Sequence, residues 1–203
     1  MKTETTFSRP VRIVVIGAGN RAHKYLEYAR RNPEQLRLAA IVEVNDLRRR
    51  AMADAFGLPD KYCYAHYDDF FAERLDADMV LISTPENAHF DPAVKAIDAG
   101  YHVLLEKPIA QRLDECREIA GRARRRGVLV GVCHVLRYHP YFAKIRELVA
   151  SGRLGHVVSV NHTASVGLDR ATHSYVRGIF RRESEANPIL LAKCCHDIDF
   201  LLW

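Results

Sequence analysis

Short apolar runs alternate with amphipathic stretches along the first 133 residues. The apolar runs predict parallel strands at 11–16, 38–42, 79–83, 102–105 and 128–133, with a short strand or turn at 62–66. Helices are expected between them, at 21–31, 46–56, 69–75, 90–99 and 114–126. Strand alternating with helix predicts an α/β fold with a doubly wound parallel sheet of the Rossmann type.

The pattern changes in the last third of the chain. Helices are expected at 140–150 and from Pro188 towards Trp203, with an alternating strand at 157–165 and loop-like segments at 174–177 and 181–183. We therefore expect a first domain over residues 8–133. Residues 134–203 would form the beginning of a second α/β (α+β) domain that binds substrate.

The first strand ends in a glycine-rich turn. Gly17 allows a tight turn, Gly19 lets the backbone approach a ligand closely, and Ala22 is small enough for the next helix to pack on the strand. The N-terminus of that helix attracts an anion, so the turn predicts a dinucleotide's diphosphate, although alone it also fits an ordinary strand-to-helix turn. The candidate cofactor-binding residues here are Gly17, Ala18, Gly19, Asn20 and Arg21.

The next strand ends in Glu43, which follows Ala22 by 43 − 22 = 21 residues. An acidic residue there accepts hydrogen bonds from the adenosine ribose and repels a 2′-phosphate, which favours NAD over NADP. Arg21, or one of the arginines at 48–50, could instead pair with that phosphate, so NADP remains the alternative. The alternative interpretation of the arginine run is that its side chains form a solvent-exposed helix face and bind no ligand.

Composition narrows the class of protein. The chain has 203 residues, 48% of them hydrophobic and 27% charged, which is enough to bury a core. The net charge of +5 comes from arginines scattered in helical segments, so nucleic acid is not an expected partner. No signal peptide or membrane-length apolar run is visible, and the expected location is cytoplasmic.

Five cysteines form no C-x-x-C pair and are expected to be reduced. Cys194, Cys195, His196 and Asp197 are adjacent on one expected helix, where neighbouring side chains point about 100° apart. No second cluster supplies further ligands, so no metal site is expected.

Several sequence blocks together resemble the Gfo/Idh/MocA family of NAD(P)-dependent oxidoreductases. They are T-P-E-N-A-H at 84–89, A-G-Y-H-V-L-L-E-K-P-I-A at 99–110, R-Y-H-P at 137–140, S-G-R-L-G at 151–155 and H-D-I-D at 196–199. The resemblance implies hydride transfer between a nicotinamide and a hydroxyl carbon of a sugar, polyol or related carbohydrate.

The resemblance also implies roles for particular residues. Lys107 of the E-K-P motif would sit beside the nicotinamide and the reacting hydroxyl, in proton transfer or in orienting the substrate. Pro108 would be cis, and His196 would be the partner of Lys107, able to exchange the alcohol proton near neutral pH. The remaining candidate cofactor contacts are Thr84, Pro85, Asn87, His89, Glu106 and Lys107 itself.

The chain departs from the family pattern near His196. Many members carry an aspartate four residues before this histidine, whereas this chain has Ala192 there and Lys193 three residues before it. Residues three apart share a helix face, so Lys193 is a third candidate catalytic residue that would bind a substrate hydroxyl or carboxylate. The residue roles that the resemblance implies come from members that carry this aspartate, so they are not settled for this chain.

Family members generally continue well beyond this length, into an open sheet that covers the substrate. The chain is thus expected to be a fragment or a truncated form, and a homo-oligomer if that sheet is present. The alternative to an active dehydrogenase is a catalytically silent dinucleotide-binding or redox-sensing module. The substrate and the physiological direction of the reaction do not follow from the sequence.

Overall fold

The computed structural model describes residues 8–178, 181–182 and 187–203. The chain divides into two compact units, Met1–Val132 and Cys133–Trp203. The division falls one residue from the boundary expected at 133/134. The assignment of the first unit as a cofactor-binding domain, and of the second as the start of a substrate-binding domain, stays a proposal.

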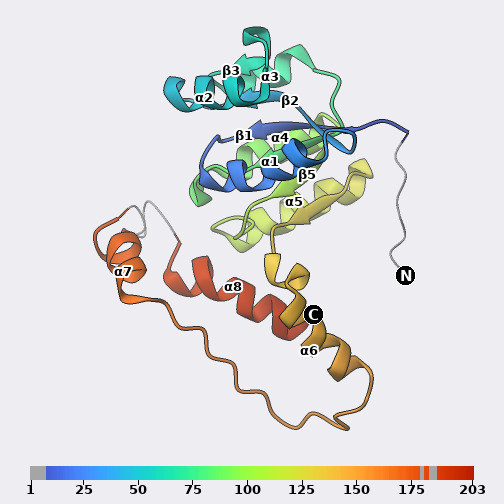
Figure 1. The fold of residues 1–203 in the computed structure, drawn as a ribbon, viewed down its shortest axis with the longest axis vertical. Coiled ribbons are helices and arrows are strands. Elements are labelled where there is room, and N and C mark those ends of the chain that lie inside the picture. The colour runs from blue at the N-terminus through green and yellow to red at the C-terminus, as the bar shows by residue number, and fades with distance from the viewer. Residues whose placement is uncertain (1–7, 179–180, 183–186) are drawn as a thin grey trace. The chain divides into compact units, whose positions relative to one another are not determined.

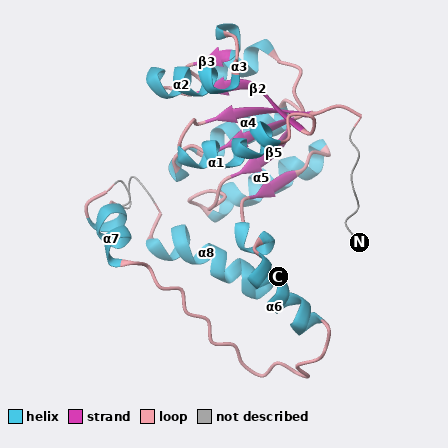
Figure 2. Cartoon of the chain, viewed as in Figure 1, coloured by secondary structure: helices cyan, strands magenta, loops and turns pink. Residues whose placement is uncertain are grey.

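The first unit is built on one parallel sheet of six strands (Figures 1 and 2). The strand order is β3-β2-β1-β4-β5-β6, and every neighbouring pair is parallel, which confirms the expected doubly wound sheet. The strands are β1 (Val11–Ile16), β2 (Leu36–Val42), β3 (Cys63–Tyr64), β4 (Met79–Ile82), β5 (His102–Leu105) and β6 (Val130–Val132). The order reverses between β1 and β4, so their carboxyl ends flank the crevice where such sheets bind ligands.

Helices cover both faces of this sheet (Figure 1). One face packs against α1 (Asn20–Arg31) and α2 (Asp46–Phe56), and the other against α3 (Tyr67–Glu73), α4 (Phe90–Asp98) and α5 (Leu113–Arg126). Successive strand residues point to opposite faces, so Val15 contacts the first group while Val14 and Ile16 contact the second. All three are almost fully buried, which explains the unbroken apolar runs.

Helix α2 shows why several boundaries were predictable. The Asn45 side chain accepts a hydrogen bond from Arg48 N–H at the first turn, and Gly57 ends the helix in the left-handed conformation with φ of +60°. These two residues set the bounds 46–56 that the sequence predicts. Two shorter helical turns follow in this unit, η1 (Asp60–Tyr62) and η2 (Glu86–Ala88).

Among the residues that the structure describes, the regular elements of the second unit are all helical, and a long segment without regular structure connects α6 (Pro140–Ala150) to α7 (Leu168–Ala171). The other elements are η3 (Val135–Tyr138), η4 (Thr172–Val176) and α8 (Ile189–Leu202). The helix at 140–150 and the C-terminal helix are confirmed. The loop expected at 174–177 is wrong for most of its length, because η4 continues the turn that α7 begins. Of the other expected loop, at 181–183, Glu183 lies outside the described residues.

The strand expected at 157–165 is also wrong. The segment forms no ladder with any described residue, and Val158 is 89% exposed. A strand needs a neighbour to bond its N–H and C=O groups, and alternation in the sequence cannot supply one. The segment is instead attached to α8 by His162, whose Nε2 lies 2.7 Å from Asp197 Oδ1.

An ion pair connects two of the sequence blocks within this unit. Arg137 donates two hydrogen bonds to Asp199, with Nε–Oδ2 and Nη2–Oδ1 distances of 2.7 Å. The hydrogen bond from Arg137 is the main reason why the pKa of Asp199 lies below its usual value. Among the described residues, none of the helices is both long and apolar enough to cross a membrane.

Candidate cofactor and active site

The glycine turn after β1 has the geometry that its sequence predicts. Gly17 has φ of +93°, and a Cβ built on it would lie 2.9 Å from the backbone of Ser83 and Thr84. The Ser83 hydroxyl donates a hydrogen bond to Gly17 O (2.7 Å), while Gly17 N–H donates to Val42 O (2.8 Å). Gly17 is therefore needed for the fold itself, because no larger residue fits between β1 and the end of β4.

Gly19 differs from Gly17 in what surrounds it. It is the N-cap of α1 with φ of −82°, and a Cβ on it would meet no atom within 4 Å. The first turn of α1 carries no acidic residue, so the positive end of its dipole is not neutralised from within the helix. The open space beside Gly19 and the N–H groups of this turn together suit an anion.

Glu43 lies at the end of β2 and is only 8% exposed. Its carboxylate accepts hydrogen bonds from two backbone N–H groups, Ala18 N to Oε2 (2.7 Å) and Asn45 N to Oε1 (2.9 Å). A carboxylate offers about four acceptor positions, so two remain for ribose hydroxyls. Glu43 thus joins the glycine turn to the start of α2, and its role toward a ribose stays a prediction.

A cavity of about 420 Å³ opens at this edge of the sheet. Its lining comes from the ends of β1, β2 and β4 and includes Gly17, Gly19, Glu43, Arg48, His66, Tyr67, Ser83, Thr84 and Pro85. Of these, Arg48 was expected only as an alternative partner of a 2′-phosphate, and His66, Tyr67 and Ser83 were not predicted as site residues. A second cavity, of about 510 Å³, lies at the opposite, amino ends of β1, β4 and β5, and no candidate residue lines it.

The three arginines at 48–50 on α2 have different surroundings in the structure. Arg49 donates hydrogen bonds to Glu43 O and to Asp46 (both 2.6 Å), and Arg50 pairs with Asp46 (2.9 Å). Arg48 lines the cavity. Arg48 is therefore the arginine of this run with access to a phosphate at the adenosine end of a dinucleotide.

The segment after β4 carries the other predicted cofactor contacts. Thr84 and Pro85 line the cavity, whereas Asn87 is exposed and is not among its lining residues. His89 is 1% exposed, with Nδ1 2.8 Å from Pro108 O and Nε2 3.1 Å from Thr84 O. His89 therefore joins the loops that follow β4 and β5.

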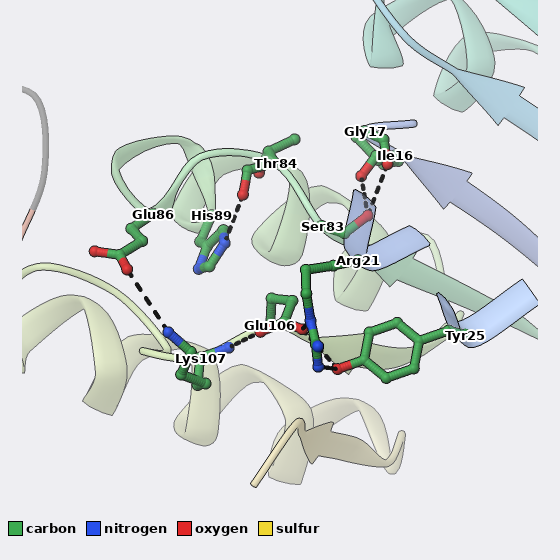
Figure 3. A network of polar contacts seen from close by, with 10 residues as sticks. All are labelled: Ile16, Gly17, Arg21, Tyr25, Ser83, Thr84, Glu86, His89, Glu106 and Lys107. Carbon is green, nitrogen blue, oxygen red and sulfur yellow. Dashed lines mark hydrogen bonds and ion pairs between the residues drawn. The ribbon is translucent and has the colours of Figure 1, made fainter. Parts of the chain in front are cut away.

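Glu106, which is itself buried, anchors a network of polar contacts at the end of β5 (Figure 3). Its Oε1 accepts hydrogen bonds from Arg21 Nε (2.7 Å) and the Tyr25 hydroxyl (2.6 Å), and its Oε2 accepts one from Lys107 N–H (3.0 Å). Burial by itself raises the pKa of Glu106, but the bonds from Tyr25 and Arg21 outweigh it and hold the pKa below the usual value. In this structure Arg21 and Glu106 fasten α1 to β5.

Lys107 follows directly, and the Lys107–Pro108 peptide bond is cis, as the resemblance implies. The Lys107 side chain is 21% exposed, and its Nζ lies 3.8 Å from Oε1 of Glu86. Glu86 belongs to η2 and is 9% exposed. It was not singled out from the sequence, because an acidic residue inside the T-P-E-N-A-H block carries no distinct signal.

His196 and Lys193 lie on α8 in the second unit, and both are partly buried. The His196 ring packs edge-on against His134, with ring centroids 5.7 Å apart. Ala192 is 3% exposed, so a buried methyl group stands where many family members have a carboxylate. The predicted pairing of His196 with Lys107 stays a prediction. No group of three or more potential ligands among His, Cys, Asp and Glu gathers in the described residues.

Comparison with known proteins identifies the family. Residues 11–134 match the Gfo/Idh/MocA family, described as an oxidoreductase family with an NAD-binding Rossmann fold. This match covers more than half of the chain, and the chain belongs to that family. The NAD-binding fold of this family confirms the expected class of cofactor, a nicotinamide dinucleotide.

Individual relatives agree with this assignment. D-xylose 1-dehydrogenase (NADP(+)) 2 from Haloferax volcanii is 36% identical over 64% of this chain and 39% of its own length. An inositol dehydrogenase homologue from Azotobacter vinelandii, solved with NADH and myo-inositol, is 25% identical, with a TM-score of 0.64 over 73% of this chain and 41% of that one. The WlbA dehydrogenase from Bordetella pertussis, solved with NADH and UDP-GlcNAcA, has a TM-score of 0.83 over 98% of this chain and 58% of that one; at 20% identity it shows the fold alone.

The chain spans less than half of the length of the curated relatives it matches; for the D-xylose dehydrogenase the share is 39%. Activity, substrate and assembly are therefore matters for proposal.

Proposed function

We propose that this chain carries the dinucleotide-binding part of an NAD(P)-dependent oxidoreductase that moves a hydride between a nicotinamide and a hydroxyl carbon of a carbohydrate. The observation that carries the proposal lies within the first unit. There a 420 Å³ cavity adjoins the glycine turn, and Lys107 stands at the end of β5, next to β4 in the sheet. The ends of β1 and β5, with β4 between them, thus offer an anion site and a cation at one edge of the sheet.

The residues at the cavity fit the ADP part of a dinucleotide. Gly19 leaves room beside the N-terminus of α1 for a diphosphate, and Glu43 has acceptor positions left for ribose hydroxyls. We propose NAD as the preferred cofactor because the Glu43 carboxylate disfavours a 2′-phosphate. NADP is the alternative, supported by Arg48 at the same cavity and by the NADP(+) in the name of the Haloferax relative.

A bound nicotinamide would supply the hydride acceptor for alcohol oxidation. The alcohol must lose a hydride from carbon and a proton from oxygen as it becomes a carbonyl compound. Lys107 would donate a hydrogen bond to that oxygen, which orients it and stabilises negative charge that develops there. For the second unit we propose that His196 exchanges a proton near neutral pH and that Lys193 binds a substrate hydroxyl or carboxylate.

The proposal is tested by titrating the full chain with NADH and NADPH and then assaying NAD(P)⁺ reduction with a panel of sugars and polyols. We expect saturable binding and turnover with at least one polyol or sugar. Lys107→Ala should bind NADH within about threefold of wild type and lose roughly 100-fold or more in turnover. The exposed Lys24→Ala is the matched control and should leave both unchanged.

Two other results are informative. Dinucleotide binding without turnover on any compound would support the silent dinucleotide-binding module over the dehydrogenase. Absence of binding by folded protein would reject both functions.

A further inference from the structure

We infer that Tyr25 is a positioning residue, which acts through Glu106 to hold the backbone of Lys107 in place for the reaction. The inference rests on the proposed function, because the placement of Lys107 matters only if substrate and nicotinamide meet beside it. The juxtaposition that carries it is a chain of two hydrogen bonds, from the Tyr25 hydroxyl to Glu106 Oε1 and from Lys107 N–H to Glu106 Oε2 (Figure 3).

The chemistry of the groups around the Tyr25 hydroxyl defines the direction of each hydrogen bond. A guanidinium group only donates, an ionised carboxylate only accepts, and a hydroxyl does both. Glu106 is ionised near neutral pH, since its pKa is held below the usual value. Arg21 Nη2 lies 2.6 Å from the Tyr25 hydroxyl, which itself lies 2.6 Å from Glu106 Oε1. Tyr25 therefore accepts from Arg21 and donates to Glu106.

Arg21 by itself leaves the Glu106 carboxylate free to turn. Its Nε donates to Oε1 (2.7 Å) while its Nη2 donates to Tyr25, so Arg21 does not bind both carboxylate oxygens as a paired fork. The last torsion angle of a glutamate side chain has no sharply preferred value. The Tyr25 hydroxyl adds a second donor to the same oxygen, which restricts rotation about that angle.

The orientation of this carboxylate matters for Lys107. Glu106 N–H still bonds Ile82 O of the neighbouring strand (3.0 Å), whereas Lys107 N–H bonds the Glu106 side chain (3.0 Å). Glu106 is 5% exposed, so little water competes for its oxygens. The Tyr25 hydroxyl, from 81 residues earlier than Glu106, thus helps to fix the point where the chain leaves β5.

The first test observes the Lys107 amide in the full chain without cofactor or substrate. Labelling with ¹⁵N-lysine restricts the NMR spectrum to lysine amides, and Lys107→Arg assigns the Lys107 signal. We expect Tyr25→Phe, which removes only the hydroxyl, to raise the exchange rate of the Lys107 amide proton with water roughly 3- to 10-fold. The amide of Lys95, inside α4, is the internal reference, because a general loss of stability would change both rates.

Tyr28→Phe is the matched control. Tyr28 lies on the same helix as Tyr25, and its hydroxyl bonds Gln35 (2.5 Å) instead of Glu106. Removing this hydroxyl should leave the ratio of Lys107 to Lys95 exchange unchanged.

Arg21→Ala tests the same carboxylate from its other donor. The variant removes the bond from Nε to Glu106 Oε1, so it should raise Lys107 exchange in the same direction as Tyr25→Phe does. If Tyr25→Phe loses the native circular dichroism spectrum, Arg21→Ala provides the comparison.

Turnover separates positioning from a purely structural role. With a compound that the wild-type chain oxidises, Tyr25→Phe should lower kcat about 10-fold and leave the KM for NAD⁺ within about threefold, because a displaced Lys107 affects the reacting geometry more than cofactor binding. Tyr28→Phe should leave both constants unchanged.

An unchanged ratio of Lys107 to Lys95 exchange in folded Tyr25→Phe overturns the inference, and so does a wild-type kcat in that variant. An equal rise in Tyr28→Phe also overturns it, because the effect would then not pass through Glu106. The proposed function is judged separately, by NADH binding and turnover of the wild-type chain. If that fails, the exchange ratio still decides whether Tyr25 holds the Lys107 backbone.

Discussion

The backbone N–H of Ala18 donates a 2.7 Å hydrogen bond to the carboxylate of Glu43, across 25 residues of sequence. Ala18 lies in the glycine turn and Glu43 at the end of β2, so this bond fixes two parts of the candidate adenosine site to one another. The residue expected to meet the ribose also shapes the turn expected to meet the diphosphate.

Replacing Glu43 should therefore affect both binding and stability. Glu43→Gln is expected to weaken NADH binding about 10-fold and to lower the free energy of unfolding by about 1–2 kcal/mol, because one backbone N–H loses its carboxylate partner. Fluorescence titration with NADH and urea denaturation measure the two effects. Glu27→Gln, an exposed change on α1, is the control. Wild-type NADH affinity in Glu43→Gln would contradict the ribose assignment.

The two glycines of the turn should behave differently when a side chain is added. Gly19→Val is expected to weaken NADH binding at least about 10-fold while costing less than about 1 kcal/mol in stability, because the new side chain enters open space. Gly17→Val should destabilise the fold by about 2–4 kcal/mol, because its Cβ meets backbone at 2.9 Å and its φ is +93°. Thermal unfolding and NADH titration separate the two cases. Equal losses of stability would show that the turn has no free space beside Gly19.

Arg48 should influence the choice between the two dinucleotides. Arg48→Ala is expected to weaken NADPH binding about 10-fold and NADH binding less than about threefold, because a charge-assisted bond to a 2′-phosphate is lost. Arg50→Ala is the matched control, since Arg50 pairs with Asp46 and does not line the cavity. Parallel titrations with NADH and NADPH measure the ratio. If both variants change the ratio of NADPH affinity to NADH affinity equally, Arg48 has no particular role in selecting between the two dinucleotides.

Glu106 should make the stability of the chain sensitive to acid. Its pKa lies below 4.5 in the folded state, so the stabilisation it provides is fully present above 4.5 and is lost as the pH falls through the folded-state pKa. Glu106→Gln is expected to lower the free energy of unfolding by about 1–3 kcal/mol near neutral pH and to lessen its decrease in acid. Urea denaturation at neutral pH and below pH 4.5 tests this. An unaltered acid dependence in the variant would contradict the sign of the shift.

Most of the first unit could be predicted from the sequence because its signals are local. Apolar runs mark strands buried on both faces, and Asn45 and Gly57 bound α2 by interactions within a few residues. The strand at 157–165 was predicted wrongly for the converse reason, since it depends on a partner strand that alternation cannot reveal.

The site was predicted in outline and not in its connections. Gly17, Glu43 and Lys107 lie at the ends of three strands, as the sequence predicts, and their roles in binding cofactor or substrate stay predictions. The network of Arg21, Tyr25 and Glu106 was missed, because it joins residues more than 80 positions apart. The position of Glu86 beside Lys107 and that of Arg48 at the cavity likewise depend on tertiary packing, which no short motif encodes.

The most direct measurement is a crystal structure of the full chain with bound NADH. The account predicts the diphosphate at the N-terminus of α1, a ribose hydroxyl on Glu43 and the nicotinamide in contact with the Lys107 side chain. A dinucleotide bound away from the glycine turn, or a nicotinamide ring remote from Lys107, would contradict it.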